Sequence, residues 1–195
     1  MSSEKLARGR PRSEEVRRSV LDAFVAAASD EGYERVSIDA VAKSAGVSRS
    51  TIYRWYKDKR ELLLDASVDI IQNNQFDPAD DAFDLVLERF LSETFATANH
   101  IGQLFTAMMA EAQADELFAQ LVWQRYAQPR RQLLSTILQR HPKATALTPD
   151  REAFILDVLF GVIWYRMMSH HAPLDEAFAE QIQQTVDQLM RSTTT

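Results

Sequence analysis

Three exposed polar side chains on one short predicted helix are the residues best suited to chemistry in this chain. Ile52 and Trp55, three residues apart, give that helix an inward face, so Arg49, Ser50 and Arg54 point outward. Arginine can pair bidentately with the edge of a guanine, and a serine hydroxyl can donate to or accept from several bases. We therefore take these three residues as candidates for contacts with DNA base edges. Phosphate contact and plain solvent exposure are the alternatives for each of them.

A preceding helix and a tight turn must position this outward face. Ser37 is a good N-cap before a run of apolar residues at helical spacing, and Ser48 can cap the helix that follows. Gly46 can adopt the left-handed backbone conformation that ends many helices. The spacing of Ala42, Gly46 and Ile52 is that of a helix-turn-helix, with a small residue at the crossing, a flexible turn and a branched residue that locks the second helix.

This segment and its flanks, residues 10–64, resemble the N-terminal DNA-binding domain of TetR-family transcriptional regulators. The residues that carry the resemblance are Gly32-Tyr33, Val36-Ser37-Ile38, Ala42, Ala45-Gly46-Val47-Ser48, Thr51-Ile52-Tyr53, Tyr56, Lys59 and Glu61-Leu62-Leu63. The family's recognition helix usually ends in a His-Phe-like pair, whereas this chain has Arg54-Trp55-Tyr56. The resemblance implies that Ser37, Thr51, Tyr53 and Lys59 contact the DNA backbone, and we add Ser48 to this set.

Composition excludes several kinds of site. The 195 residues include no cysteine, so disulfides, thiolate zinc sites and thiol redox sensing are absent. No nucleophile motif, phosphate-binding glycine loop or catalytic carboxylate pair is recognisable, so we expect neither an enzyme nor a cofactor. His170 and His171 are adjacent and lack an acidic or thiolate partner at ligand spacing, so no metal site is expected. No apolar run approaches the ~20 residues of a membrane span and no signal-peptide core is visible, so we expect a cytoplasmic protein without a membrane partner.

Charge is distributed unevenly along the chain. The net charge is −6, yet residues 1–60 hold 13 Lys/Arg against 9 Asp/Glu, and the rest of the chain holds 9 against 19. A basic module joined to an acidic one is expected when only the first approaches phosphates. We predict a flexible basic arm at residues 1–12, a DNA-binding domain at 13–60 and a second domain at 61–195. The arm either binds DNA or is a solvated tail.

The predicted fold is all-α, with about nine helices and no strand-like alternation. The first helix is expected to start at a Ser13 cap, and Asp58 with Glu61 should form a capping box at the start of the fourth. Turn-forming residues at 73–81 mark a linker. The later predicted helices cover residues 83–95, 101–108, 115–139, 149–168 and 178–189, with a kink or break at Pro129 in the third of these.

The acidic half resembles the family's ligand-binding and dimerisation half in layout. Its aromatic and methionine residues are too numerous to line a pocket together, so most should be core. The candidates for the pocket are Phe90, Phe105, Met108, Trp123, Tyr126, Trp164 and Met168. Polar residues that could orient a ligand among them are His100, Gln103, Gln113 and Arg166, each of which can equally be structural or exposed.

One recognition helix buries too little surface for specificity, so we predict a homodimer that binds a palindromic double-stranded DNA operator. The last two helices are the expected interface, where they would form a four-helix bundle. A small hydrophobic ligand is expected to release the DNA, and the resemblance implies repression as the usual outcome. A helical small-molecule carrier and an effector-independent architectural DNA binder are the alternatives.

Overall fold

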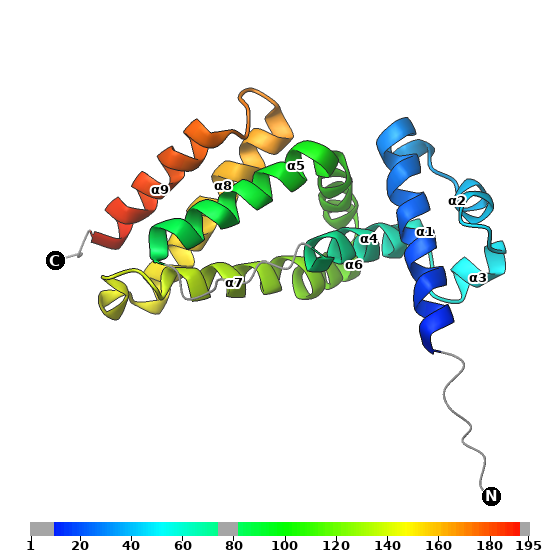
Figure 1. Cartoon of the computed structure of the whole chain (residues 1–195), viewed down its shortest axis with the longest axis horizontal. Helices are drawn as coiled ribbons and strands as arrows, with labels where there is room; N and C mark the ends of the chain where they lie inside the picture. Colours follow the sequence, from blue (N-terminus) through cyan, green and yellow to red (C-terminus); the bar gives the residue numbers. More distant parts are fainter. Residues whose placement is uncertain (1–9, 74–81, 192–195) are drawn as a thin grey trace, which may run out of the picture. The chain divides into compact units, whose positions relative to one another are not determined.

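The computed structural model describes residues 10–73 and 82–191, and these residues are helical throughout, with short turns and no strands (Figure 1). The chain forms two compact units, Met1–Ile70 and Ile71–Thr195. The all-α prediction is therefore confirmed. The first nine residues of the predicted arm and residues 74–81 of the predicted linker lie outside the described residues. Within the described ranges, every helix is too short or too polar to cross a bilayer.

Four helices build the N-terminal unit: α1 (Arg10–Glu31), α2 (Ile38–Ser44), α3 (Arg49–Tyr53) and α4 (Lys59–Asn73). Helix α1 starts at Arg10, so the predicted start at Ser13 was wrong and residues 10–12 belong to the helix. Pro11 is compatible with this start because the amides of the first turn have no helical acceptor. The N-terminal unit ends at Ile70, ten residues after the domain boundary expected at residue 60.

The helix-turn-helix is defined by local hydrogen bonds at its helix ends. Ser37 Oγ accepts from the Ala40 amide at 3.1 Å, and Ser48 Oγ accepts from the Thr51 amide at 3.2 Å. Between the two helices Gly46 has a φ of 66°, a conformation that costs little only without a Cβ. Ile52 is fully buried, so the inward side of α3 is held in the core of the unit. The predicted caps and turn are confirmed.

Helix α4 begins at a capping arrangement close to the predicted one. Asp58 Oδ1 accepts from the amides of Arg60 and Glu61, at 3.0 and 3.1 Å. Glu61 Oε2 reaches back to the amide of Lys57 at 2.8 Å, one residue before the cap. Together these bonds satisfy amides that the first helical turn leaves without partners.

Helices α5 to α9 build the C-terminal unit. Helix α5 (Phe83–Ala114) runs through both of the predicted helices 83–95 and 101–108, and its backbone leaves helical geometry only at Ile101 (φ −133°, ψ 20°). Two helices were expected here, and the structure has two helical segments that meet at this kink without a loop between them. Helices α8 (Pro149–Ser169) and α9 (Glu176–Arg191) follow the predicted ranges, and Thr148 Oγ1 caps α8 at the Arg151 amide.

Pro129 divides the long helix predicted at 115–139. The structure has α6 (Glu116–Val122), a π-helical turn at Trp123–Ala127 and α7 (Gln128–Leu138), with Pro129 in the first turn of α7. A proline cannot donate an amide hydrogen bond to the preceding turn, so the chain widens by one residue before it. The predicted break is confirmed, and its form is a π turn.

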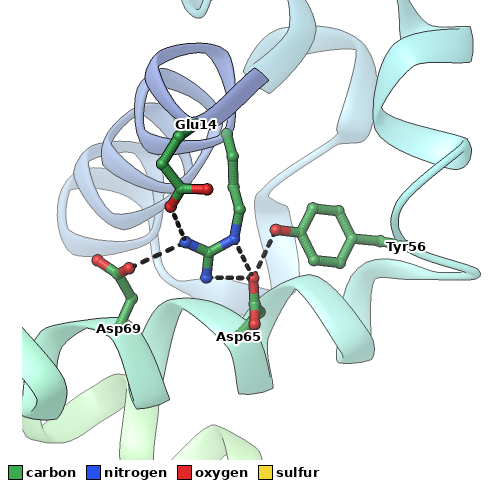
Figure 2. A network of polar contacts seen from close by, with 5 residues as sticks. Glu14, Tyr56, Asp65 and Asp69 are labelled. Atoms are coloured by element: carbon green, nitrogen blue, oxygen red, sulfur yellow. Dashed lines mark hydrogen bonds and ion pairs between the residues drawn. The ribbon is translucent and has the colours of Figure 1, made fainter. Parts of the chain in front are cut away.

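A buried carboxylate joins three parts of the N-terminal unit (Figure 2). Arg17 of α1 donates to Asp65 Oδ2 of α4 from Nε at 3.1 Å and from Nη2 at 2.8 Å. The Tyr56 hydroxyl, just after α3, donates to the same oxygen at 2.6 Å. Arg17 Nη1 also contacts Asp69 at 3.2 Å and Glu14 at 3.1 Å. Asp65 is 7% exposed, so its charge depends on these donors.

The ionisation of this network is set by its surroundings. Burial, together with the hydrogen bond to Asp65, raises the pKa of Tyr56, so the phenol remains a donor. Burial alone would lower the pKa of Arg17, but the Asp65 carboxylate outweighs it and the pKa is raised. At neutral pH the network is therefore an ion pair with a phenolic hydrogen bond.

We expect Asp65→Asn to lower the free energy of unfolding of the N-terminal unit by about 2–4 kcal/mol, because the Arg17 cation loses its buried partner. Tyr56→Phe should cost about 1 kcal/mol, the loss of one hydrogen bond. Urea unfolding of the full chain measures the loss, and hydrogen exchange at α1 and α4 assigns it to this unit. Glu14→Gln is the control, because the Glu14 side chain is 68% exposed. Equal losses from Asp65→Asn and Glu14→Gln would contradict the central role of Asp65.

Candidate nucleic-acid interface

Helix α3 presents its polar residues on the outside. Arg49, Ser50, Tyr53 and Arg54 are exposed, while Ile52 is buried beneath them. Tyr53, with 44% of its surface accessible, is one of the exposed large hydrophobic side chains of the described chain. The helix therefore offers two cations, a hydroxyl and a phenol to whatever lies against this surface.

Three hydroxyls meet in the first turn of α3. Ser48 Oγ lies 2.8 Å from Ser50 Oγ and 2.9 Å from Thr51 Oγ1. Hydroxyl groups can rotate and exchange one partner for another at low cost, and phosphate oxygens are good acceptors. This group of hydroxyls, together with the exposed Ser37 at the start of α2, can donate to a phosphate backbone.

Arg49 is held in place by neighbours on both helices of the motif. Its Nη1 contacts Asp39 Oδ2 of α2 at 3.2 Å, its Nη2 donates to Tyr53 Oη at 3.4 Å, and its guanidinium lies 5.3 Å from the centre of the Tyr53 ring. The hydrogen bond to Tyr53, followed by the charge of Asp39, raises the pKa of Arg49. Because Arg49 and Asp39 are both well exposed, this pair can open without a large free-energy cost.

Sequence reasoning missed Asp39. It lies ten residues before Arg49, and only the crossing of α2 and α3 brings the two side chains together. An acidic residue next to an expected DNA-contacting arginine also orients that arginine before binding. Asp39 is thus part of the candidate interface although it cannot itself bind an anion.

Arg54 and Lys59 differ in their contacts with the rest of the protein. Arg54 is exposed, with its guanidinium 5.7 Å from the centre of the Trp55 ring. The Lys59 ammonium donates to the carbonyls of Tyr33 and Glu34, at 3.0 and 3.2 Å, and lies 4.2 Å from the centre of the Tyr33 ring. Lys59 therefore ties the start of α4 to the turn after α1, and its contact with the DNA backbone remains a prediction.

The seven predicted pocket residues do not share one environment. Phe90, Phe105, Met108 and Tyr126 are buried, and the rings of Phe105 and Tyr126 are 5.4 Å apart. Trp164 is half-buried. Trp123 is 50% exposed and Met168 61% exposed, so in the single chain neither lines an interior site. Trp123 opens the π turn before Pro129, and Met168 lies on the outer face of α8, which helical periodicity alone did not reveal.

Three of the predicted polar residues line one groove, and its lining includes none of the seven predicted pocket residues. His100, Gln103 and Arg166 line a surface groove of about 640 Å³ beside the turn between α8 and α9, whereas Gln113 is exposed elsewhere. Arg166 donates to the Pro173 carbonyl at 2.8 Å, and its guanidinium lies 3.4 Å from the centre of the Phe178 ring. These contacts join α8 to the turn before α9 and to α9 itself, so Arg166 has a structural role. No group of three or more metal-ligating side chains occurs in the described part of the chain.

Both halves of the chain match models of one protein family. Residues 20–66 match the family described as bacterial regulatory proteins, tetR family, and residues 82–186 match the tetracyclin repressor-like C-terminal domain. The second match alone covers more than half of the chain.

Individual proteins give the same result. The HTH-type transcriptional regulator YdeS of Bacillus subtilis (strain 168) is 24% identical over 178 residues, which is 90% of this chain and 89% of YdeS. The crystal structure of the TetR family transcription regulator SCO0332 aligns with 93% of this chain and 100% of its own, at a TM-score of 0.71 and 26% identity. The Thermus thermophilus FadR, a transcriptional repressor solved in complex with lauroyl-CoA, shares the fold at a TM-score of 0.70 and 18% identity, covering 92% of this chain and 95% of FadR. The chain belongs to the TetR family, whose members are non-enzymatic DNA-binding transcriptional regulators.

Proposed function

We propose that this regulator is a repressor that binds a palindromic DNA operator as a homodimer and releases it when a small apolar ligand binds. The observation that carries the proposal is the exposed face of α3, where Arg49, Ser50 and Arg54 stand on a buried Ile52. In helix-turn-helix proteins, the second helix packs on the domain with its apolar side and places its exposed polar side chains in the major groove.

The proposed division of labour follows from exposure and chemistry. Arg49 and Arg54 are the candidates for guanine edges and Ser50 for a permissive base contact. The hydroxyls of Ser37, Ser48, Thr51 and Tyr53 and the Lys59 ammonium are the candidates for phosphates, which position the protein without reading sequence. Arg49 would exchange its exposed partner Asp39 for the DNA.

An apolar stripe on α8 supports the homodimer. Its large exposed members are Phe154, Val162, Tyr165 and Met168, whose spacing places them on one side of the helix. At Gly161, within the stripe, no atom lies within 4 Å of where a Cβ would stand, so a partner helix could approach closely there. The outer side of α9 carries glutamines, so we assign the apolar part of the interface to α8 and the polar rim to α9.

The buried aromatic group of the C-terminal unit supports an apolar ligand. Phe90, Phe105 and Met108 of α5 and Tyr126 of the π turn are buried, and the rings of Phe105 and Tyr126 lie 5.4 Å apart. The FadR relative was solved with lauroyl-CoA, a molecule with a long apolar chain. A ligand releases DNA only if it binds the state with the wrong recognition-helix spacing more tightly, and such coupling is typically about 1–3 kcal/mol.

Arg54→Ala should relax discrimination at one base pair of the operator by about 1–3 kcal/mol if Arg54 reads a base edge. We would select the operator from random DNA with the purified protein and measure anisotropy with the operator and its single-base variants. Lys143→Ala, which removes an exposed cation from the turn between α7 and α8, outside both α3 and the proposed interface, should change nothing. A uniform loss across all DNA sequences would assign Arg54 to a phosphate instead.

Tyr165→Asp should convert the dimer to a monomer, because it places a charge in the apolar stripe of α8, and operator binding should fall with it. Sedimentation velocity measures the state of assembly, and circular dichroism checks that the fold is kept. Gln113→Asp adds the same charge at an exposed position outside the stripe and should leave the dimer intact. A wild-type protein that remains monomeric at micromolar concentration, or a Tyr165→Asp dimer, would refute the assigned interface.

A further inference from the structure

Asp39 places a negative charge at the candidate DNA interface. It lies in the first turn of α2, its side chain is 67% exposed, and its Oδ2 accepts from Arg49 Nη1 of α3 at 3.2 Å. DNA phosphates repel a carboxylate, so Asp39 lowers the affinity of this surface for any duplex unless a donor compensates its charge. In the free protein that donor is Arg49.

DNA binding removes this compensation. In its proposed role Arg49 contacts a guanine edge, and for this its guanidinium exchanges the Asp39 carboxylate for DNA. Its second terminal nitrogen, Nη2, donates to Tyr53 Oη at 3.4 Å, and its guanidinium lies 5.3 Å from the centre of the Tyr53 ring. Tyr53 keeps the guanidinium on this side of α3, so Arg49 reaches the DNA beside Asp39. The carboxylate then faces the DNA without its protein partner.

The contact with Arg49 also sets how close Asp39 lies to the bases. Because Asp39 Oδ2 is 3.2 Å from Arg49 Nη1, a base edge within reach of this nitrogen is also close to the carboxylate. Successive nucleotides of one strand are spaced by about 3.4 Å along the duplex. The carboxylate would therefore face either the base that pairs with the guanine or an adjacent base.

Only two kinds of base can donate to a carboxylate in the major groove. Cytosine presents its N4 amino group and adenine its N6 amino group, whereas guanine presents O6 and N7 and thymine presents O4, all of which are acceptors. An ionised carboxylate is an acceptor only. Its charge is therefore compensated beside cytosine or adenine, and it is repelled beside guanine or thymine.

We propose that Asp39 is a specificity-determining residue that accepts a hydrogen bond from the amino group of a cytosine or adenine next to the guanine contacted by Arg49. The two side chains, one from each helix of the motif, offer an acceptor and a donor side by side. Both are well exposed, so their ion pair can open at little cost and each partner can bind a base instead. This inference rests on the proposed function, in which α3 enters the major groove, and it adds a base that α2 reads.

The test uses the full chain and the operator that it selects from random DNA. Anisotropy measures the affinity of the wild type and its variants for the operator and for all single-base changes, and Arg49→Ala identifies the guanine. Beside this guanine the wild type should prefer cytosine or adenine to guanine or thymine about fivefold or more. Asp39→Ala should abolish that preference. Asp39→Asn, whose amide can also donate, should extend binding to guanine and thymine.

The charge of Asp39 gives a second readout. Asp39→Ala leaves the Arg49 cation without its carboxylate, so affinity for random-sequence DNA should rise about two- to fivefold and fall more steeply with salt. Asp22→Ala is the matched control, because it removes an exposed carboxylate from α1, outside the helix-turn-helix, and should leave every base preference unchanged. An acidic residue in the first turn also favours α2, but that structural role alone would not change which base is preferred.

The outcomes distinguish this inference from the proposed function. A base preference that survives Asp39→Ala, or an unchanged affinity for random-sequence DNA, would overturn the role of Asp39. A loss confined to the guanine would show that Asp39 only positions Arg49, which also overturns it. A protein that selects no sequence would refute the proposed function and this inference with it. Base preferences that depend on Arg49 but not on Asp39 would refute this inference alone.

Discussion

The buried carboxylate of Asp65 is the interaction on which the N-terminal unit depends. A charge that is 7% exposed must be paired, and here the partners are the Arg17 guanidinium of α1 and the Tyr56 hydroxyl after α3. One carboxylate oxygen therefore joins the first helix, the end of the helix-turn-helix and α4. Because all three elements meet at one atom, none can shift within this unit without leaving a buried polar group unsatisfied.

This constraint matters because α3 is too short to be stable alone. Its five residues cannot offset the cost of starting a helix, so its geometry comes from the Ser48 cap, the buried Ile52 and the anchored Tyr56 that follows. Because the buried side of α3 is fixed by these contacts, the side chains on its exposed side can exchange hydrogen-bond partners without disturbing the helix. The Arg49 and Asp39 pair is exposed and weak, so Arg49 can exchange this partner for another at little cost.

The C-terminal unit uses a different device, a proline that widens the preceding turn. Pro129 removes an amide donor, and in the π turn at Trp123–Ala127 the Trp123 side chain is exposed while Tyr126 is buried. The sequence predicted a break at Pro129 but not which side chains it would bury. The burial of Tyr126 and the exposure of Trp123, both named as pocket candidates, are therefore findings of the structure.

The sequence by itself determined the features that depend on neighbours along the chain. The caps at Ser37, Ser48 and Thr148, the left-handed Gly46 and the all-α class follow from hydrogen bonds and side-chain periods within about four residues. The tertiary structure alone decided which distant groups meet: Arg17 with Asp65 across 48 residues, Arg130 with Thr94 across 36, and the shared kinked helix α5. Such contacts depend on how the helices cross. The extra residue of a π turn rotates the side chains that follow it and so changes which of them meet. A local pattern in a single sequence does not encode these contacts.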